Sequence, residues 1–410
     1  RGRPPPVTQP KGPFMPNDTA IREATTVVVI GAGPAGLTLA NLLRLAGVGC
    51  VVLERHSRAH VESRQRAGVL DYHGACVFEE WGLAGEILAG MPGDGSLEIR
   101  VDGEPRLLDV AALSGGRTGA LIPQQILIGR LLNAHQKAGA DVRFAADGVA
   151  LHDIAGPEPK VTYRDSDGAL HEITCAYIAG CDGGHGASRA AVPADALTTY
   201  SYDHGIGWFT ILADVPPPRH PLMAISSHGF AAHFARGPKA SRFYLQCDPG
   251  ADPAHWGEER LWTQLRLRLG DDDLPAATIT DKTVVDMRSF VADPMRHGRL
   301  FLAGDAAHII TPMGGKGMNL AIADADVLAR ALRAAVHDHD DTGLQAYSET
   351  CLKRVWNNQE YSRWLTEMTH EAGDESLAGP FRHRLARARL ERLFTSEAAA
   401  RALVDLMAGG

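Results

Sequence analysis

The chain has 410 residues, of which 45% are hydrophobic and 22% are charged, and its formal net charge is −8. This length suffices for two or three domains with substantial cores, and the composition is ordinary for a globular protein. The acidic balance, without basic stretches interleaved with aromatic residues, argues against nucleic-acid binding. No apolar run reaches the roughly 18–20 residues of a membrane span and no signal-peptide pattern is present, so we expect no membrane partner and a cytoplasmic location.

The six cysteines are scattered without a Cys-x-x-Cys pair, which is typical of buried free thiols in a reducing compartment. Residues 1–14 are proline-rich and precede Met15, and we interpret them as an expression-tag remnant or a disordered arm. There is no His-Glu-x-x-His spacing and no Gly-x-Ser-x-Gly motif, so we expect neither a metal site nor serine-hydrolase chemistry.

A buried strand, a glycine-rich turn and a helix follow one another between residues 27 and 46. In this pattern Gly31 allows the tight turn, Gly33 lets a pyrophosphate approach the backbone, and Gly36 lets helix and strand pack closely. A second strand ends in Glu54, about twenty residues on, where a carboxylate can bind a ribose hydroxyl. The order of these features predicts a dinucleotide site, and the alternative is a glycine turn in some other βαβ unit.

Four arginines lie within twelve residues, at Arg55, Arg58, Arg64 and Arg66. They form either a solvated basic loop or a cradle for a flavin pyrophosphate or an incoming nicotinamide dinucleotide. Beside a dinucleotide fold we favour the cradle, and Arg55 and Arg58 are also candidates for binding a 2′-phosphate.

Two later strand ends carry an aspartate beside glycines. Asp182 lies in an Asp-Gly turn, which on its own is as readily a plain turn as a ligand site. Asp305 ends a second buried strand, and a glycine-rich loop then leads through Gly317 to a helix that begins at Met318. Glycines permit close approach to a ligand, and the helix dipole points at it. We interpret His308 in this stretch as a core residue.

The composition changes between residues 200 and 292, where strand-like runs flank the proline-rich corner at residues 216–218. This pattern predicts a mostly antiparallel second domain inserted into the first. Residues 344–406 read as helical.

These motifs occur in the same order in the single-component (class A) flavoprotein aromatic hydroxylases, which the chain resembles from about Thr26 to the C-terminal helix. The resemblance includes the unbroken stretches 64–70, 178–183 and 297–309. It implies a mixed α/β fold: a Rossmann-like FAD-binding domain of the type found in these hydroxylases, with an inserted, mostly antiparallel substrate domain and a C-terminal helical segment. The expected divisions are 1–14 (tag remnant or arm), 24–198 (FAD-binding domain, first part), 199–292 (β-rich substrate domain), 293–343 (FAD-binding domain, returning segment) and 344–410 (helical region).

By this resemblance Glu54 would hold the adenosine ribose of FAD, and Asp305 would bind the ribityl chain. Backbone groups at the start of the late helix would face the pyrimidine edge of the flavin, where a helix N-terminus stabilises the reduced, anionic ring. The expected cofactor-binding residues are Gly31, Gly33, Ala35, Gly36, Glu54, Arg55, Arg64, Arg66, Ala67, Gln124, Asp182, Asp305, Gly317, Met318 and Asn319. The residues expected at the nicotinamide cofactor are Arg64, His185 and Arg189.

The reaction implied by the family uses FAD, NAD(P)H and O2. NAD(P)H reduces the flavin, oxygen adds to give a C4a-hydroperoxide, and one oxygen atom passes to an electron-rich aromatic ring. The protein positions the substrate and keeps water away. Pro312, with its carbonyl near the substrate, and Arg66 are the expected catalytic residues.

The expected substrate pocket departs from that of the phenol-specific members of the family. Those enzymes bind and deprotonate the substrate hydroxyl with a tyrosine, and the matching position here is at or near Ala224. A second tyrosine of their proton relay matches Met407, the relay histidine matches Asp94, and a carboxylate-binding serine matches Phe234. Deprotonation activates a phenol, so a chain without the relay needs a substrate that is already electron-rich.

Arg236 and Tyr244 match the family's partners for a substrate carboxylate, and charge-assisted hydrogen bonds suit that task. The alternative for Arg236 is an ordinary surface charge. We therefore expect a larger apolar aromatic, such as an indole- or carbazole-like natural-product ring, to contact the substrate residues Ala224, Phe234, Arg236, Tyr244 and Pro312.

Three other functions compete with this one. The first is 3-hydroxylation of 4-hydroxybenzoate or another phenolic acid, and the second is a non-catalytic protein that holds FAD and a ligand. A flavin-dependent halogenase is disfavoured because no Trp-x-Trp segment is present, and an NAD-dependent dehydrogenase leaves the glycine loop after Asp305 unexplained. A homodimer is expected from the resemblance alone.

Overall fold

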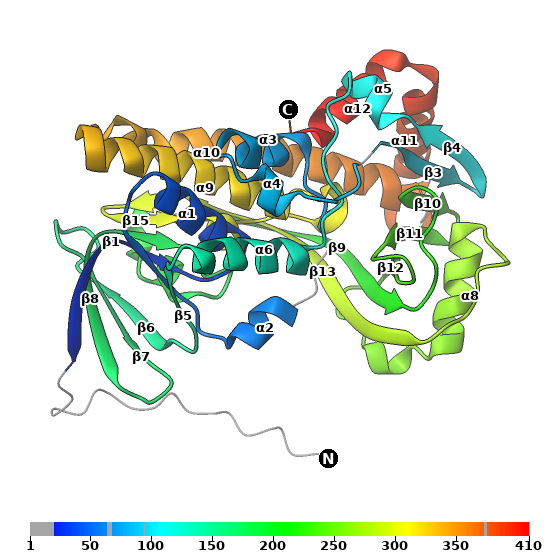
Figure 1. Ribbon diagram of the computed structural model, residues 1–410. Helices are drawn as coiled ribbons and strands as arrows, with labels where there is room; N and C mark the ends of the chain where they lie inside the picture. The colour runs from blue at the N-terminus through cyan, green and yellow to red at the C-terminus, as the bar shows by residue number, and fades with distance from the viewer. Residues whose placement is uncertain (1–19, 64–67, 94, 373–374, 410) are drawn as a thin grey trace.

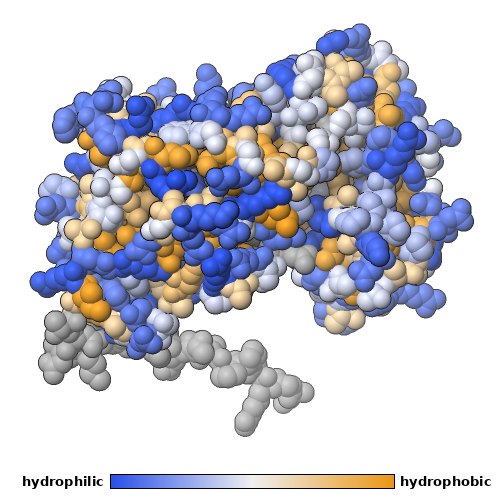
Figure 2. Space-filling view, in the orientation of Figure 1, coloured by the Kyte–Doolittle hydropathy of each residue, from blue (hydrophilic) through white to orange (hydrophobic). Residues whose placement is uncertain are grey.

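The computed structural model describes residues 20–63, 68–93, 95–372 and 375–409. Two eight-stranded sheets organise this part of the chain, and helices cover both (Figure 1). Hydrophilic side chains cover much of the face shown in Figure 2, with hydrophobic ones scattered among them. Of the helices described, none combines the length and the apolar character that crossing a membrane requires.

The first sheet contains the predicted dinucleotide-binding strands. Its parallel strands lie side by side in the order β15-β8-β1-β2-β5. The last four residues of β1 are fully buried, which explains their apolar, β-branched sequence. The strands of the first sheet are β1 (Ile21–Ile30), β2 (Cys50–Leu53), β5 (Asp141–Arg143), β6 (Asp147–His152), β7 (Lys160–Arg164), β8 (Leu170–Gly180), β14 (Arg296–His297) and β15 (Leu300–Leu302).

Helices pack on this sheet in the manner of a Rossmann-like fold. The helix α1 that follows the first strand lies between α6 and α9, and α9 packs in turn on α10 (Figure 1). These helices are α1 (Pro34–Leu45), α6 (Gln124–Lys137), α9 (Gly317–Arg333) and α10 (Thr342–Thr366). Shorter helices are α2 (Arg58–Ser63), α3 (Tyr72–Glu80), α4 (Ala84–Ile87) and α7 (Ala187–Ala190).

The second sheet is mostly antiparallel, as predicted, and runs in the order β16-β13-β9-β12-β11-β10-β3-β4. Strands β3 and β4 precede residue 199 in the chain, and β3 joins β10 in parallel. The strands are β3 (Leu97–Val101), β4 (Glu104–Leu108), β9 (Thr198–Ala213), β10 (Leu222–Ser226), β11 (Gly229–Ala235), β12 (Ser241–Cys247), β13 (Ile279–Asp293) and β16 (His308–Ile309).

The two faces of the second sheet have different neighbours. Helix α8 (Glu258–Leu269) packs on one face, against β10 and β11. The other face meets the C-terminal helices α11 (Glu375–Thr395) and α12 (Glu397–Met407), and α12 contacts the short helix α5 (Val110–Ser114). The predicted helical C-terminal segment is confirmed.

Candidate functional site

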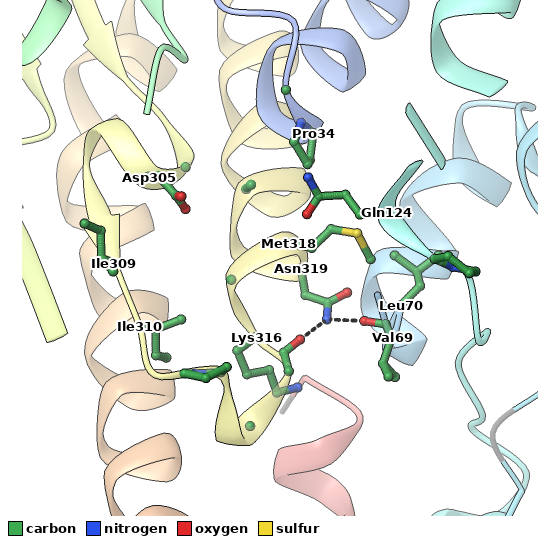
Figure 3. Close-up of a pocket in the computed structure, with 18 of the residues that line it drawn as sticks. Pro34, Val69, Leu70, Gln124, Asp305, Ile309, Ile310, Lys316, Met318 and Asn319 are labelled. Carbon is green, nitrogen blue, oxygen red and sulfur yellow. Dashed lines mark hydrogen bonds between the residues drawn. The ribbon is translucent and has the colours of Figure 1, made fainter. Parts of the chain in front are cut away.

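A single cavity of about 1670 Å³ extends from the glycine turn after β1 to the inner face of the second sheet. Residues of both sheets and of the C-terminal helices line it, so it joins the predicted cofactor and substrate regions. Figure 3 shows the part of its wall around the start of α9.

The glycine turn leaves the N-terminus of α1 open to this cavity. Gly31 has φ +105°, and a Cβ there would lie 2.4 Å from the carbonyl oxygen of Cys181, so only glycine fits. A Cβ at Gly33 would meet no protein atom within 4 Å. Helix α1 begins at Pro34 without a side-chain cap, and Ala35 follows in its first turn. Its first N–H groups therefore face a space that a pyrophosphate can fill.

Glu54 lies at the end of β2, is only 7% exposed and lines the cavity. Its two carboxylate oxygens accept hydrogen bonds from the backbone N–H groups of Ala32 and His56, each at 2.8 Å. Each oxygen keeps a further lone pair, so the carboxylate is fixed in place yet can accept a ribose hydroxyl. The neighbouring Arg55 is exposed and also lines the cavity.

Helix α9 begins at Gly317 beside the cavity, with unpaired N–H groups and the positive end of its dipole there. The side chain of Asn319 holds this start in place. Its Nδ2 donates to the carbonyl oxygens of Val69 and Gly315, each at 2.9 Å (Figure 3), and its Oδ1 accepts from the backbone N–H of Asp71 at 3.0 Å. The helix start is thus a rigid donor surface suited to a delocalised anion.

The buried ion pair of Lys316 and Asp71 lies next to this helix start, and sequence reasoning missed it. Nζ of Lys316 donates to Oδ2 of Asp71 at 2.8 Å and to the carbonyl oxygen of Met407 at 2.9 Å. The only signal in the sequence was a lone lysine among glycines directly before a helix.

Four more of the expected cofactor residues surround the same space. Asp305 on the turn η3 (Gly304–Ala306), Gln124 at the start of α6 and Met318 on α9 line the cavity (Figure 3). Oδ2 of Asp182 accepts from the N–H and hydroxyl of Ser188, at 2.9 and 3.0 Å, which fixes the Asp-Gly turn. Burial raises the pKa of Asp182, and its Oδ1 has no hydrogen-bond partner among the described residues.

The structure describes two of the three residues expected at the nicotinamide cofactor. Arg64 lies outside the described residues, as do Arg66 and Ala67, which were expected at the flavin. His185 is exposed and lines the cavity. The guanidinium of Arg189 donates to the carbonyl oxygens of Gly184 and Ala306 and lies over the ring of Phe290 at 4.4 Å. Its contacts in this structure therefore hold two loops together.

His308 is a buried core residue, as the sequence indicated. Its Nε2 lies 2.6 Å from Oδ2 of Asp324, which also accepts from the backbone N–H of Gly304 at 3.0 Å. Burial opposes a charge on His308, but the carboxylate of Asp324 outweighs burial, so the pKa of His308 is raised. This pair fixes the turn that carries Asp305.

Met223, not Ala224, faces the substrate part of the cavity. The two residues are neighbours on β10, so their side chains lie on opposite faces of the sheet. Met223 lines the cavity, whereas Ala224 is fully buried in the cluster beneath α8. Contrary to the expectation, Ala224 is therefore not part of the cavity wall, and Met223 takes that place. Pro312, on the turn η4 (Pro312–Gly314), lines the cavity as expected.

The other expected substrate residues meet in this wall. Arg236, Tyr244 and Phe234 all line the cavity, and the rings of Phe234 and Tyr244 pack edge to face at 5.8 Å. Burial lowers the pKa of Arg236, while the hydroxyl of Tyr244 hydrogen-bonds the guanidinium and favours its charged form. Arg236 is therefore half-buried against the cavity and is not an ordinary surface charge.

An aromatic group at the far end of the cavity also escaped the sequence reasoning. Trp208 stacks on Phe230 at 5.2 Å and lies against Tyr244 at 4.9 Å. Its Nε1 donates to Nε2 of His370 at 2.7 Å. Burial lowers the pKa of His370 to about 3, so the ring is neutral and accepts this bond. Six of the nine methionines in the chain line the cavity, which makes its wall apolar and adaptable.

The cavity has the features that FAD requires. The cavity offers two helix N-termini, an open face beside Gly33 and a carboxylate at the end of β2. These are the groups that a pyrophosphate, a ribose and an anionic ring require.

Comparisons with known proteins agree with this assignment. A family described as an FAD binding domain matches residues 24–362. The p-hydroxybenzoate hydroxylase of Acinetobacter baylyi is 37% identical over 390 residues, which cover 94% of this chain and 95% of that protein. The probable NADH-specific resorcinol 4-hydroxylase of Rhodococcus jostii is 26% identical over 377 residues, covering 86% and 66%.

The fold also has a solved counterpart. The p-nitrophenol 4-monooxygenase of Pseudomonas putida has a TM-score of 0.82 at 20% identity, with 95% of this chain and 99% of that chain covered. The chain belongs to the FAD-binding domain family of flavoprotein aromatic hydroxylases. It is an FAD-dependent aromatic monooxygenase, and NAD(P)H is the usual reductant of the family.

Proposed function

We propose that this enzyme hydroxylates a large, electron-rich aromatic substrate, such as an indole- or carbazole-like natural-product ring that bears an acidic group. The apolar wall around Met223 carries this proposal. In the described part of that wall, Met223 and Phe234 stand where phenol-specific relatives would use polar groups, and Trp208 and Phe230 extend the aromatic surface. Such a wall favours a bulky apolar ring.

Three tyrosines line the cavity, and none is well suited to deprotonating a phenol. The pKa of Tyr72 is raised, chiefly by its interaction with the side chain of Cys76. Burial raises the pKa of Tyr361, so its hydroxyl keeps its proton. Tyr244 hydrogen-bonds the guanidinium of Arg236 and serves the acid-binding end of the site. The substrate therefore has to be electron-rich without help from a proton relay.

Bound FAD, once reduced by NAD(P)H, supplies the activation of O2 and the transfer of one oxygen atom to the ring. In this proposal the N-terminus of α1 binds the pyrophosphate, and Glu54 binds the ribose. The start of α9 stabilises negative charge on the flavin ring. Arg236 and Tyr244 hold an acidic group of the substrate, and the apolar wall keeps water away from the reacting atoms beside Pro312.

A second candidate is 3-hydroxylation of 4-hydroxybenzoate or another phenolic acid. The 37% identity to a p-hydroxybenzoate hydroxylase over nearly the whole chain supports it. A non-catalytic protein that holds FAD and a ligand is the third. A homodimer remains a proposal from the family resemblance, and light scattering of the purified protein tests it. A cytoplasmic location remains a proposal from the scattered cysteines.

The deciding experiment follows NADH and NADPH consumption in air by the FAD-loaded enzyme, together with peroxide and product mass. The panel contains hydroxybenzoates, indoles and carbazoles. We expect a product one oxygen atom heavier from an indole-type ring, with little peroxide. Efficient product from a hydroxybenzoate would favour the second candidate and contradict the first. The absence of both peroxide and product would favour the third candidate, a non-catalytic protein that holds FAD and a ligand.

A further inference from the structure

Arg242 is a buried cation in the wall of the cavity, and the function proposed above gives it no task. It lies on β12, two residues before Tyr244, so both side chains are on the cavity face of the sheet. Arg242 is only 4% exposed. Its Nε is buried without a hydrogen-bond partner in the part of the chain that the structure describes.

Arg236 places a second cation beside it. Its Nε is also buried and without a partner among the described residues, although one Nη donates to the carbonyl oxygen of Ala235 at 3.1 Å. The charge of Arg242 is close enough to lower the pKa of Arg236, in addition to the larger effect of burial and against that of Tyr244. Two positive charges therefore meet at one end of the cavity.

The described residues supply no negative partner for this pair of guanidiniums. The nearest carboxylate on the cavity face by strand register is Asp281 of β13, which is separated from Arg242 by Leu212 of the intervening strand. No ion pair joins Asp281 to Arg236 or Arg242 within the described ranges. A buried cation is costly unless it is paired, so the missing charge belongs to a ligand.

We propose that Arg242 and Arg236 together bind a doubly negative group on the aromatic substrate, either two neighbouring carboxylates or one phosphate ester. This rests on the proposed function in that the ligand is the aromatic substrate of the same cavity. Planar guanidiniums suit both groups because each forms paired hydrogen bonds to carboxylate or phosphate oxygens. Tyr244, two residues beyond Arg242 on the same face of β12, is placed to donate to the same group.

The test is calorimetric titration of the FAD-loaded protein, without NAD(P)H, by benzoate, phthalate and phenyl phosphate. One charged hydrogen bond gained corresponds to about tenfold in Kd, so we expect phthalate or phenyl phosphate to bind at least about tenfold more tightly than benzoate. The comparison of phthalate with phenyl phosphate identifies which doubly negative group the site prefers. Benzoate binding as tightly as both would overturn the proposal.

Variants separate Arg242 from the rest of the site. R242Q should raise the Kd of the doubly negative ligands by about tenfold and the Kd of benzoate by less than about twofold. R242K should recover part of the lost affinity for the doubly negative ligands. R260Q removes an exposed arginine that stacks on Trp256 and should change nothing. An equal loss for all three ligands in R242Q, with an unchanged melting temperature, would contradict the proposal.

The titrations measure ligand binding without turnover, so they test this inference separately from the proposed function. Tight binding of a doubly negative ligand by a protein that hydroxylates nothing would support this inference and contradict the proposed function. Hydroxylation of a singly charged or neutral ring, with no preference for doubly negative ligands, would support the proposed function and contradict this inference.

Discussion

Nζ of Lys316 lies 2.8 Å from Oδ2 of Asp71, and the two side chains are 2% and 7% exposed. The same Nζ donates to the carbonyl oxygen of Met407. One buried cation therefore joins the loop before α9, the loop before α3 and the end of α12. These three segments come from different parts of the chain, and all of them line the cavity.

Removing Lys316 should destabilise the protein strongly. Lys316→Met leaves the carboxylate of Asp71 buried and unpaired, and we expect a loss of about 3–5 kcal/mol in the free energy of unfolding. Urea denaturation of the FAD-loaded protein measures it. The control is Arg330→Met, which removes a half-exposed arginine from its pairs with Glu80 and Asp326 and should cost less than about 1 kcal/mol. Similar losses in the two variants would contradict this account.

Gly33→Ala should weaken FAD binding without unfolding the protein. Its Cβ would meet no protein atom within 4 Å, but it would occupy the space where the pyrophosphate approaches the backbone. We expect FAD affinity to fall by about tenfold or more at an unchanged fold, measured by flavin fluorescence on titration. Gly129→Ala within α6 also meets no atom within 4 Å and should leave FAD affinity unchanged. Wild-type affinity in Gly33→Ala would show that the pyrophosphate lies elsewhere.

The pair of His308 and Asp324 should make stability fall as the pH rises. The pKa of folded His308 is raised above its ordinary value of about 6.5, so the folded protein holds this proton more tightly than the unfolded chain. The stabilisation is complete below about pH 6.5 and is lost as the pH rises through the raised pKa. Melting temperatures between about pH 6 and 9 should therefore decline in the wild type and decline less in His308→Gln.

An exposed histidine provides the control for this pH dependence. His152 bonds the hydroxyl of Thr162 at the surface, so His152→Gln should keep the full decline. A His308→Gln variant with the same decline as the wild type would mean that other groups cause it.

Tyrosine at position 223 should improve the use of phenolic acids. Met223→Tyr brings a hydroxyl to the cavity face, where it can contact a substrate phenol, and we expect tighter binding and faster turnover of 4-hydroxybenzoate. Ala224→Tyr forces a ring into a fully packed cluster and should cost about 1–3 kcal/mol or more of stability without any gain in activity. Steady-state kinetics and melting temperatures compare the two. A gain in Ala224→Tyr alone would reverse the assignment of the two faces.

Local patterns predicted a dinucleotide site in this protein, and the family resemblance identified its ligand as FAD. The turn at Gly31, the carboxylate of Glu54 and the helix that begins near Met318 each depend on neighbours in sequence, and the structure places all of them around one cavity. Strand-turn-helix geometry is set by glycine positions and apolar runs, and such features are visible in a single chain. The family resemblance in these stretches reflects the same local constraints.

The substrate half was decided by tertiary structure. Whether Met223 or Ala224 faces the cavity depends on strand register, because one residue of shift inverts every side chain. In the sequence Arg242 cannot be distinguished from an exposed strand residue, and only its place between β9 and β11 shows that it is buried. The ion-pair partner of Lys316, Asp71, is 245 residues away in the chain. Burial and pairing between distant segments set the charge and shape of this pocket, and no local pattern encodes them. The sequence by itself determined the fold and the cofactor, whereas packing decided what the cavity presents to a substrate.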